Sequence, residues 1–176
     1  IVYSWANIAM PWSMESTRRM SFFYLQFVVF HLAVAANIGM SFVIPYAPGL
    51  MKPMIIVRLL QILFAAACAI GCYRMYRRLS NPAIRLISTP DDFFSLALLT
   101  GWSFASIFAA MNRPDLGEGP LMVYFIMTAF FLVYVPFSKI SHYLYYPFTR
   151  FYFGRTMGHR GVYPVKRVTQ PKPTHI

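Results

Sequence analysis

The sequence has little negative charge and few charged residues of either sign. Only 5 of its 176 residues are Asp or Glu, against 16 Lys and Arg, and charged residues make up 12% of the chain. This share is about half of that in a typical soluble domain. With 58% hydrophobic residues and a mean hydropathy of +0.51, the composition predicts a membrane protein. It leaves no room for a separate soluble domain beside several spans.

Cysteine is scarce as well. Cys68 and Cys72 lie in one apolar run, so they predict neither a disulfide framework nor a C-x-x-C-H haem-attachment motif. We interpret them as small packing residues one helical turn apart. The sequence has no internal repeat, no glycine-rich phosphate loop and no histidine–carboxylate cluster typical of metalloenzymes. It shows no charged start followed by an apolar core and a small-residue cleavage site, so we expect no signal peptide.

Four apolar stretches are long enough to cross a membrane, which takes about 20 predominantly apolar residues. They cover about 20–44, 54–73, 93–111 and 121–146. The sequence therefore predicts an all-α fold, an integral membrane four-helix bundle over residues 20–146. Residues 1–19 form an N-terminal segment, either interfacial or the remnant of an earlier span, and residues 147–176 form a basic tail. Asp91 and Asp92 are expected at the N-cap and first turn of the third span, where negative charge is favourable.

Lysine and arginine are concentrated on one side of these spans. Arg18 and Arg19 precede the first span. The second-to-third connection and the C-terminal tail carry most of the others: Arg74, Arg77, Arg78, Arg85, Arg150, Arg155, Arg160, Lys166, Arg167 and Lys172. By the positive-inside rule, both termini and the middle connection are cytoplasmic. Topology and anionic lipid headgroups explain the net charge of +11 better than nucleic acid binding does.

Two of the four histidines, His31 and His142, lie in the first and fourth expected spans. A single histidine in a helix is most often a hydrogen-bonded interior residue. Two on different helices of a small bundle, however, suffice as the axial ligands of a b-type haem. By the helix rise, His31 lies about 16 Å and His142 about 6 Å from the cytoplasmic ends of their spans. Spacing alone leaves both interpretations open.

The segment around His142 adds a family resemblance. PFSKISH (136–142), followed by Pro147, resembles the last membrane helix of the respiratory nitrate reductase gamma-subunit family of cytochromes b. FHLAVAANIGM, which contains His31, resembles that family's first haem-ligand helix, and RRLSNPAIRLISTPDDFFSLALL resembles its basic cytoplasmic loop and the next helix start. The resemblance covers most of residues 27–155 and implies that His31 and His142 ligate the iron of one haem b.

The departures from the family pattern are informative too. Two-haem members carry one more histidine eighteen residues before the last ligand and another ten residues after the first; here these positions are Tyr124 and Ser41. Both ligands of the outer haem are absent together, whereas both ligands of the inner haem are present. The chain is thus similar to a one-haem form, as in the Hmc and Tmc transmembrane redox complexes of sulfate reducers and in heterodisulfide-reductase-like membrane anchors.

This resemblance implies an electron-transfer subunit of a respiratory redox complex, rather than a catalyst alone, in the inner (cytoplasmic) membrane of a prokaryotic cell. The implied partners are a cytoplasmic iron–sulfur protein, an outer-side multihaem cytochrome c, membrane lipids, and menaquinone or ubiquinone. Two alternatives remain. One is a haem-free structural anchor of such a complex, and the other is a small transporter or channel subunit, which would need ionisable residues along a path.

Five cations are candidate site residues. Arg74, Arg77, Arg78 and Lys139 lie near the cytoplasmic end, where they would pair with haem propionates or, alternatively, serve as topology and lipid-headgroup charges. Arg58 lies about five residues into the second span on the outer side, where it either snorkels to the interface or contacts a quinone. The quinone interpretation follows from the resemblance, because that family places a basic residue early in this helix beside its quinone pocket.

We predict that replacing Arg58 with Gln alters the rate of quinol-linked haem reduction without bleaching the haem, because the residue would act at the quinone and not at the iron. Stopped-flow reduction by a quinol analogue measures this. Unchanged kinetics would remove Arg58 from the site.

Overall fold

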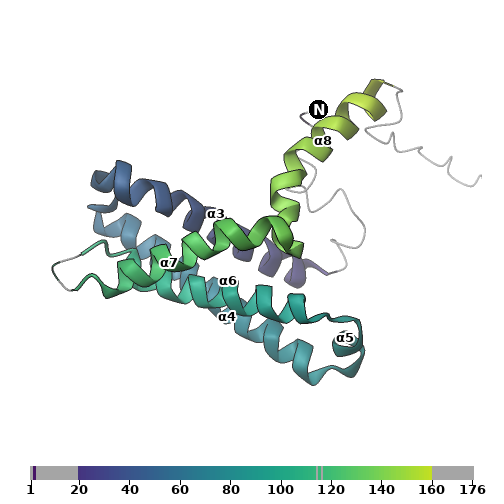
Figure 1. Cartoon of the computed structure of the whole chain (residues 1–176), viewed down its shortest axis with the longest axis horizontal. Helices are drawn as coiled ribbons and strands as arrows, with labels where there is room; N and C mark the ends of the chain where they lie inside the picture. The colour runs from purple at the N-terminus through teal and green to yellow at the C-terminus, as the bar shows by residue number, and fades with distance from the viewer. Residues whose placement is uncertain (1, 3–19, 114, 116, 160–176) are drawn as a thin grey trace, which may run out of the picture. The chain divides into compact units, whose positions relative to one another are not determined.

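The computed structural model describes Val2 and residues 20–113, 115 and 117–159, apart from the side chains of Tyr143 and His159. Within these residues every regular element is helical. The elements are α3 (Ser21–Tyr46), η2 (Pro48–Met51), α4 (Met54–Ser80), α5 (Pro82–Ile87), α6 (Pro90–Ala109), α7 (Gly119–Tyr134), η4 (Val135–Phe137), η5 (Lys139–Ser141) and α8 (His142–His159) (Figure 1). The predicted N-terminal segment and the end of the basic tail lie outside the described residues.

Four helices are long and apolar enough to cross a membrane: Ser21–Tyr46, Met54–Ser80, Pro90–Ala109 and Gly119–Phe137. The predicted all-α fold with four spans is therefore confirmed. The fold is that of a multi-pass membrane protein, whereas the orientation of the spans stays a prediction. In each span only 17–33% of the most apolar window is buried inside the protein, so most apolar side chains face outwards, where lipid would cover them.

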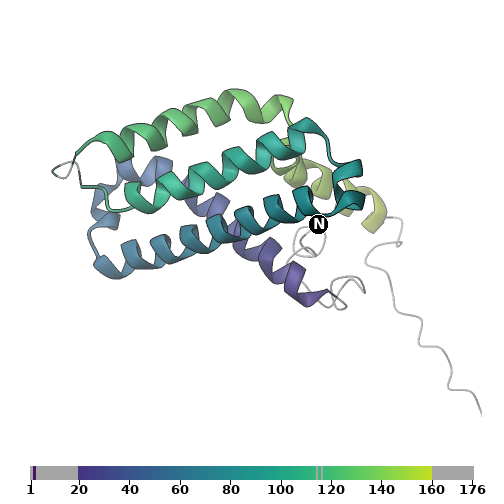
Figure 2. The ribbon, with the colours of Figure 1, turned by 90° about the horizontal axis from the view of Figure 1, so that it is seen from below.

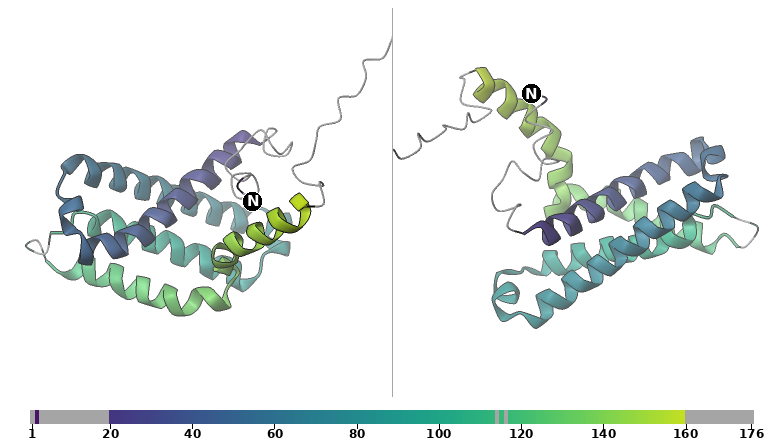
Figure 3. Two further views of the ribbon diagram at one scale, coloured as in Figure 1. Left: turned by 90° about the horizontal axis from the view of Figure 1, so that it is seen from above. Right: turned by 180° about the vertical axis from the view of Figure 1, so that it is seen from behind.

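The chain divides into two compact units, Met20–Ser141 and a unit that contains α8, and each is described by itself. In the first unit α4, α6 and α7 lie side by side in that order (Figure 2). Helix α3 crosses this layer obliquely and packs on α4 and α6 (Figure 3). All sites described below, except His142, belong to this four-helix unit.

Polar residues set the helix ends at the predicted cytoplasmic side. Asn81 ends α4 and caps α5, because its Oδ1 accepts hydrogen bonds from the backbone N–H groups of Ala83 and Ile84. Thr89 starts α6 through a capping box with Asp92, with Pro90 at the first helical position. The predicted place of Asp91 and Asp92 in the first turn is confirmed, but the predicted N-cap position is wrong, because the N-cap residue is Thr89.

The fourth span is shorter than the sequence predicts. It ends at Phe137 rather than near residue 146, because Pro136 has no N–H for the helical ladder and Ser138 is extended at φ −110° and ψ 170°. The chain then forms η5 and starts a new helix, α8, at His142. Pro147, the first residue after the predicted span, lies inside α8.

Helices α4 and α6 approach most closely at Gly71. A Cβ atom added there would overlap with Oγ1 of Thr100, whose hydroxyl donates to the carbonyl of Leu96 in the same helix. Gly39 of α3, in contrast, has nothing within 4 Å of an added Cβ. Of these two glycines, Gly71 is the one whose small size the helix packing requires, as is common in membrane bundles.

We predict that Gly71→Ala lowers the thermal stability of the detergent-solubilised protein relative to Gly39→Ala. Both changes raise helix propensity equally. The difference in stability between the two variants therefore measures the cost of the steric overlap, which is about 1–3 kcal/mol. Adding Thr100→Ala to Gly71→Ala is expected to restore part of the loss. Equal melting temperatures for the two alanine variants would contradict the close approach.

Candidate functional site

His31 lies on the outward face of α3. The buried residues of this helix are Gln26, Phe30, Ala33, Asn37, Met40 and Ile44, which share one face at helical spacing. His31 follows Phe30 directly, so it lies about 100° around the helix from it, and its side chain is exposed. The imidazole thus lies on the outward face of a membrane-spanning helix and not among the buried residues of that helix.

The ring of His31 is held in a defined tautomer. Its Nδ1 lies 2.8 Å from the carbonyl oxygen of Phe27, one turn earlier. Because a carbonyl only accepts hydrogen bonds, Nδ1 carries a proton in this contact, so in the neutral imidazole the lone pair is on Nε2. The ring also packs on Phe27, with the ring centroids 4.0 Å apart. An imidazole whose Nδ1–H is bound to a backbone carbonyl is the usual form of a metal-ligating histidine.

His142 is the first residue of α8, and its side chain is exposed. It follows the end of the fourth span by five residues, so the predicted depth of about 6 Å inside that span does not apply. His31 and His142 belong to different units of the structure. Their pairing across one haem stays a prediction.

Three arginines near the predicted cytoplasmic end of α4 are held in place by different elements. Arg74 lies over the ring of Phe30, 5.6 Å from its centroid, and Arg77 lies over Phe23 at 4.6 Å. Arg78 donates to the hydroxyl of Ser88 at 2.8 Å.

These arginines line a cavity of about 230 Å³ together with Phe23, Ile84 and Leu96. None of the three has a carboxylate partner among the described residues. Three adjacent cations without a counter-charge repel one another, so the cavity attracts an anionic group. The structure thus brings together three of the four cations predicted for haem propionates.

Lys139, the fourth, has other contacts. Its Nζ lies 2.9 Å from Oδ2 of Asp92 and 2.8 Å from Oγ1 of Thr89. Its backbone N–H donates to Asp91 at 3.1 Å. Lys139 therefore neutralises the acidic start of α6. Sequence reasoning missed this role because 47 residues separate Lys139 from Asp92 and no local pattern indicates the pair.

Asp91 completes this contact between the ends of α6 and α7. Its carboxylate accepts a hydrogen bond from the hydroxyl of Tyr134, and the hydroxyl of Ser95 lies 2.8 Å from the same phenol oxygen. We call Thr89, Asp91, Asp92, Tyr134 and Lys139 the α6–η5 junction. It holds the backbone and the side chain of Lys139 against the first turn of α6.

Tyr124 fills the position at which two-haem members of the resembling family carry a histidine. Its side chain is fully buried, and its hydroxyl donates to the backbone carbonyl of Asn37 at 2.6 Å. The ring stacks on Trp102, with centroids 6.1 Å apart and planes 11° apart, and the side chain of Ser41 interacts with the same phenol. The two substituted positions thus meet in a packed part of the core.

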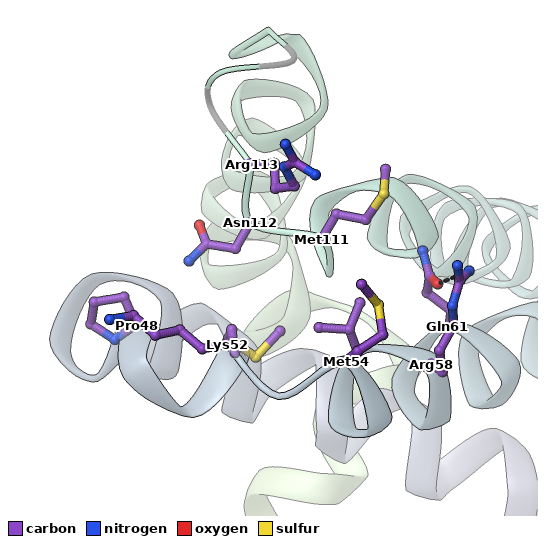
Figure 4. Close-up of a pocket in the computed structure, with 10 residues that line it drawn as sticks. Pro48, Lys52, Met54, Arg58, Gln61, Met111, Asn112 and Arg113 are labelled. Carbon is purple, nitrogen blue, oxygen red and sulfur yellow. Dashed lines mark hydrogen bonds between the residues drawn. The ribbon is translucent and has the colours of Figure 1, made fainter.

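Arg58 borders a second cavity, of about 530 Å³, at the opposite end of the four-helix unit (Figure 4). Its Nη1 donates to Oε1 of Gln61 at 3.2 Å, and Nε2 of Gln61 donates to the carbonyl of Ile107 in α6 at 2.9 Å. Gln61 therefore holds the guanidinium at the cavity. Lys52 and Arg113 also line it; sequence reasoning did not group them with Arg58, because they lie in different connections.

We predict that Asp92→Ala destabilises the protein by about 1 kcal/mol, because α6 loses its capping box and Lys139 loses its carboxylate. Melting in detergent measures this. The matched control is Asp115→Ala, which also removes a carboxylate paired with a cation, Arg113 at 2.7 Å, but on an exposed connection. We expect little change for the control; equal effects of the two variants would contradict a structural role for the junction.

Comparisons of the chain with family models, with curated proteins and with solved structures found no match. We therefore infer the function from the residues and from their geometry. The features that carry most information are the His31 tautomer, the unneutralised arginines of α4 and the cation-lined cavity at Arg58.

Proposed function

We propose that this chain is the membrane-anchoring cytochrome b subunit of a respiratory redox complex, with one haem b ligated by His31 and His142. The observation that carries the proposal is the hydrogen bond from Nδ1 of His31 to the carbonyl of Phe27. It presents Nε2, the nitrogen with the lone pair, on the exposed side of a membrane-spanning helix. A histidine that served only in packing would have no need of this outward position.

The residues present fit such a group in two respects. Imidazole is a standard axial ligand of haem iron, and the tautomer of His31 is the one that ligation requires. Arg74 and Arg77 of α4 lie over the rings of Phe30 and Phe23. These two phenylalanines belong to α3, the helix that carries His31, so we assign the two arginines to the propionates. Lys139 is left out of this assignment because it contacts Asp92 and Thr89.

Tyr124 supports one haem rather than two. A bound haem accepts and donates single electrons. By the family resemblance, a second haem in the outer half of the bundle would need ligands at positions 41 and 124. There the Tyr124 ring is fully buried against Trp102, and a phenol bound to a backbone carbonyl supplies no imidazole. The protein's own contributions are the ligand nitrogens, the arginine charges and the apolar surroundings, which tune the potential of a haem.

In this proposal the subunit lies in the cytoplasmic membrane of a prokaryote. It relays electrons between the membrane, with its quinone pool or an outer-side multihaem cytochrome c, and a cytoplasmic iron–sulfur protein. Substrate chemistry would belong to these partners. The quinone contact of Arg58 stays a prediction, since its guanidinium is exposed and held by Gln61.

We predict that His31→Ala and His142→Ala each abolish the b-type absorption spectrum while the protein stays in the membrane, because a haem with one axial ligand is lost or becomes high-spin. His175→Ala, in the C-terminal tail, is the matched control and is expected to keep the spectrum. Dithionite-reduced minus oxidised spectra of membranes, with immunoblots for the protein level, measure both.

Retention of the spectrum in both helix variants would overturn the ligand assignment. A wild-type protein without haem, in which both histidines only form hydrogen bonds, would favour the haem-free anchor instead.

A further inference from the structure

The cavity at Arg58 lies where a membrane surface would meet the bundle. It is formed by the connection between α3 and α4, the first turns of α4 and the connection that follows α6, with Pro48, Met51, Met54, Val57 and Met111 among its lining residues. The ends of membrane-spanning helices lie at the level of the lipid headgroups. The cavity volume of about 530 Å³ is within the range of small-molecule sites.

The polar side of this cavity is cationic. Lys52, Arg58 and Arg113 line it, with the amides of Gln61 and Asn112, and no carboxylate is among the lining residues. Arg113 is paired with Asp115, whose pKa is lowered by the guanidinium. Lys52 and Arg58 have no carboxylate partner in the described part of the chain. Two cations without a carboxylate partner among the described residues thus line one cavity.

The position of Arg58 is set before any ligand arrives. The chain of hydrogen bonds from Arg58 to Gln61, and from Gln61 to the carbonyl of Ile107, links α4 to α6, as Figure 4 shows for the first of these contacts. A guanidinium held in this way loses little conformational entropy when it binds an anion. Guanidinium and phosphate oxygens form strong, charge-assisted hydrogen bonds.

The other side of the cavity is apolar. Met51 and Val57 are buried, each with a relative exposure of 6%, whereas Met54 and Met111 are exposed. Methionine side chains adapt to irregular apolar ligands. A cationic edge beside a methionine-lined wall matches an amphiphile with a charged head and a hydrocarbon tail.

We propose that this cavity binds the anionic phosphodiester head of a membrane phospholipid, with the phosphate at Lys52 and Arg58 and the start of an acyl chain against the methionines. A free phosphate ion would pair with the cations but would make no contact with the apolar wall. A neutral quinone would contact the apolar wall but would leave two cations without an anion. The site does not involve either histidine, so it goes beyond the haem proposal, and it competes with the quinone contact predicted for Arg58.

The test uses the full chain purified in detergent and three probes: dihexanoyl phosphatidylglycerol, dihexanoyl phosphatidylcholine and inorganic phosphate. Microscale thermophoresis measures the apparent Kd. We expect phosphatidylglycerol to bind more tightly than the other two. Arg58→Gln and Lys52→Gln should each weaken its binding about ten-fold, the effect of losing one charged hydrogen bond. Arg85→Gln, which removes an exposed cation of α5, should leave it unchanged.

Equal affinities for phosphatidylglycerol and phosphatidylcholine would overturn the proposal, as would equal effects of Arg58→Gln and Arg85→Gln. If inorganic phosphate binds as tightly as phosphatidylglycerol, the proposal of a lipid is overturned and the ligand of the cavity is a free anion. An uncharged short-chain quinone binding more tightly than phosphatidylglycerol would assign the cavity to a quinone. The haem content of Arg58→Gln is expected to match the wild type, so failure here is distinguishable from failure of the haem proposal.

Discussion

Two carboxylates in the first turn of α6, Asp91 and Asp92, hold the start of this helix to the residues at the end of the fourth span. Asp92 caps α6 and binds Lys139, while Asp91 binds the hydroxyl of Tyr134 and the backbone N–H of Lys139. These contacts form at the point where Pro136 and Ser138 interrupt the helix. The junction thus connects the start of α6 to the end of the fourth span. Few acids occur in this sequence, and two of the five are placed here.

Cations are used differently at the two ends of the four-helix unit. At the predicted cytoplasmic end, three arginines of α4 line a small cavity, and two of them, Arg74 and Arg77, lie over phenylalanine rings of α3. At the other end, Lys52 and Arg58 border a larger, half-apolar cavity. In both places positive charge is held at a membrane boundary without a carboxylate among the described residues. This arrangement suits anionic groups supplied from outside the chain, a cofactor's propionates at one end and a lipid phosphate at the other.

The sequence predicts much of this fold because apolar runs and turn residues are local signals. The four spans and the acidic start of α6 follow from them. The end of the fourth span does not, since Pro136 and Pro147 both look like breaks, and only Pro136 is followed by an extended residue. The candidate site is predicted in part: the position of His31 is local, and so is the arginine cluster. The pairing of Lys139 with Asp92, and the grouping of Lys52 with Arg58 and Arg113, depend on long-range packing that no local pattern encodes.

The central claim is that one haem b is bound per polypeptide. A pyridine haemochrome assay on the purified protein, with the protein concentration from amino-acid analysis, tests it most directly. We expect a ratio of one haem b per chain. A ratio of zero would contradict it and leave a membrane anchor, and a ratio of two would contradict the interpretation of Tyr124 and Ser41 as a lost outer site.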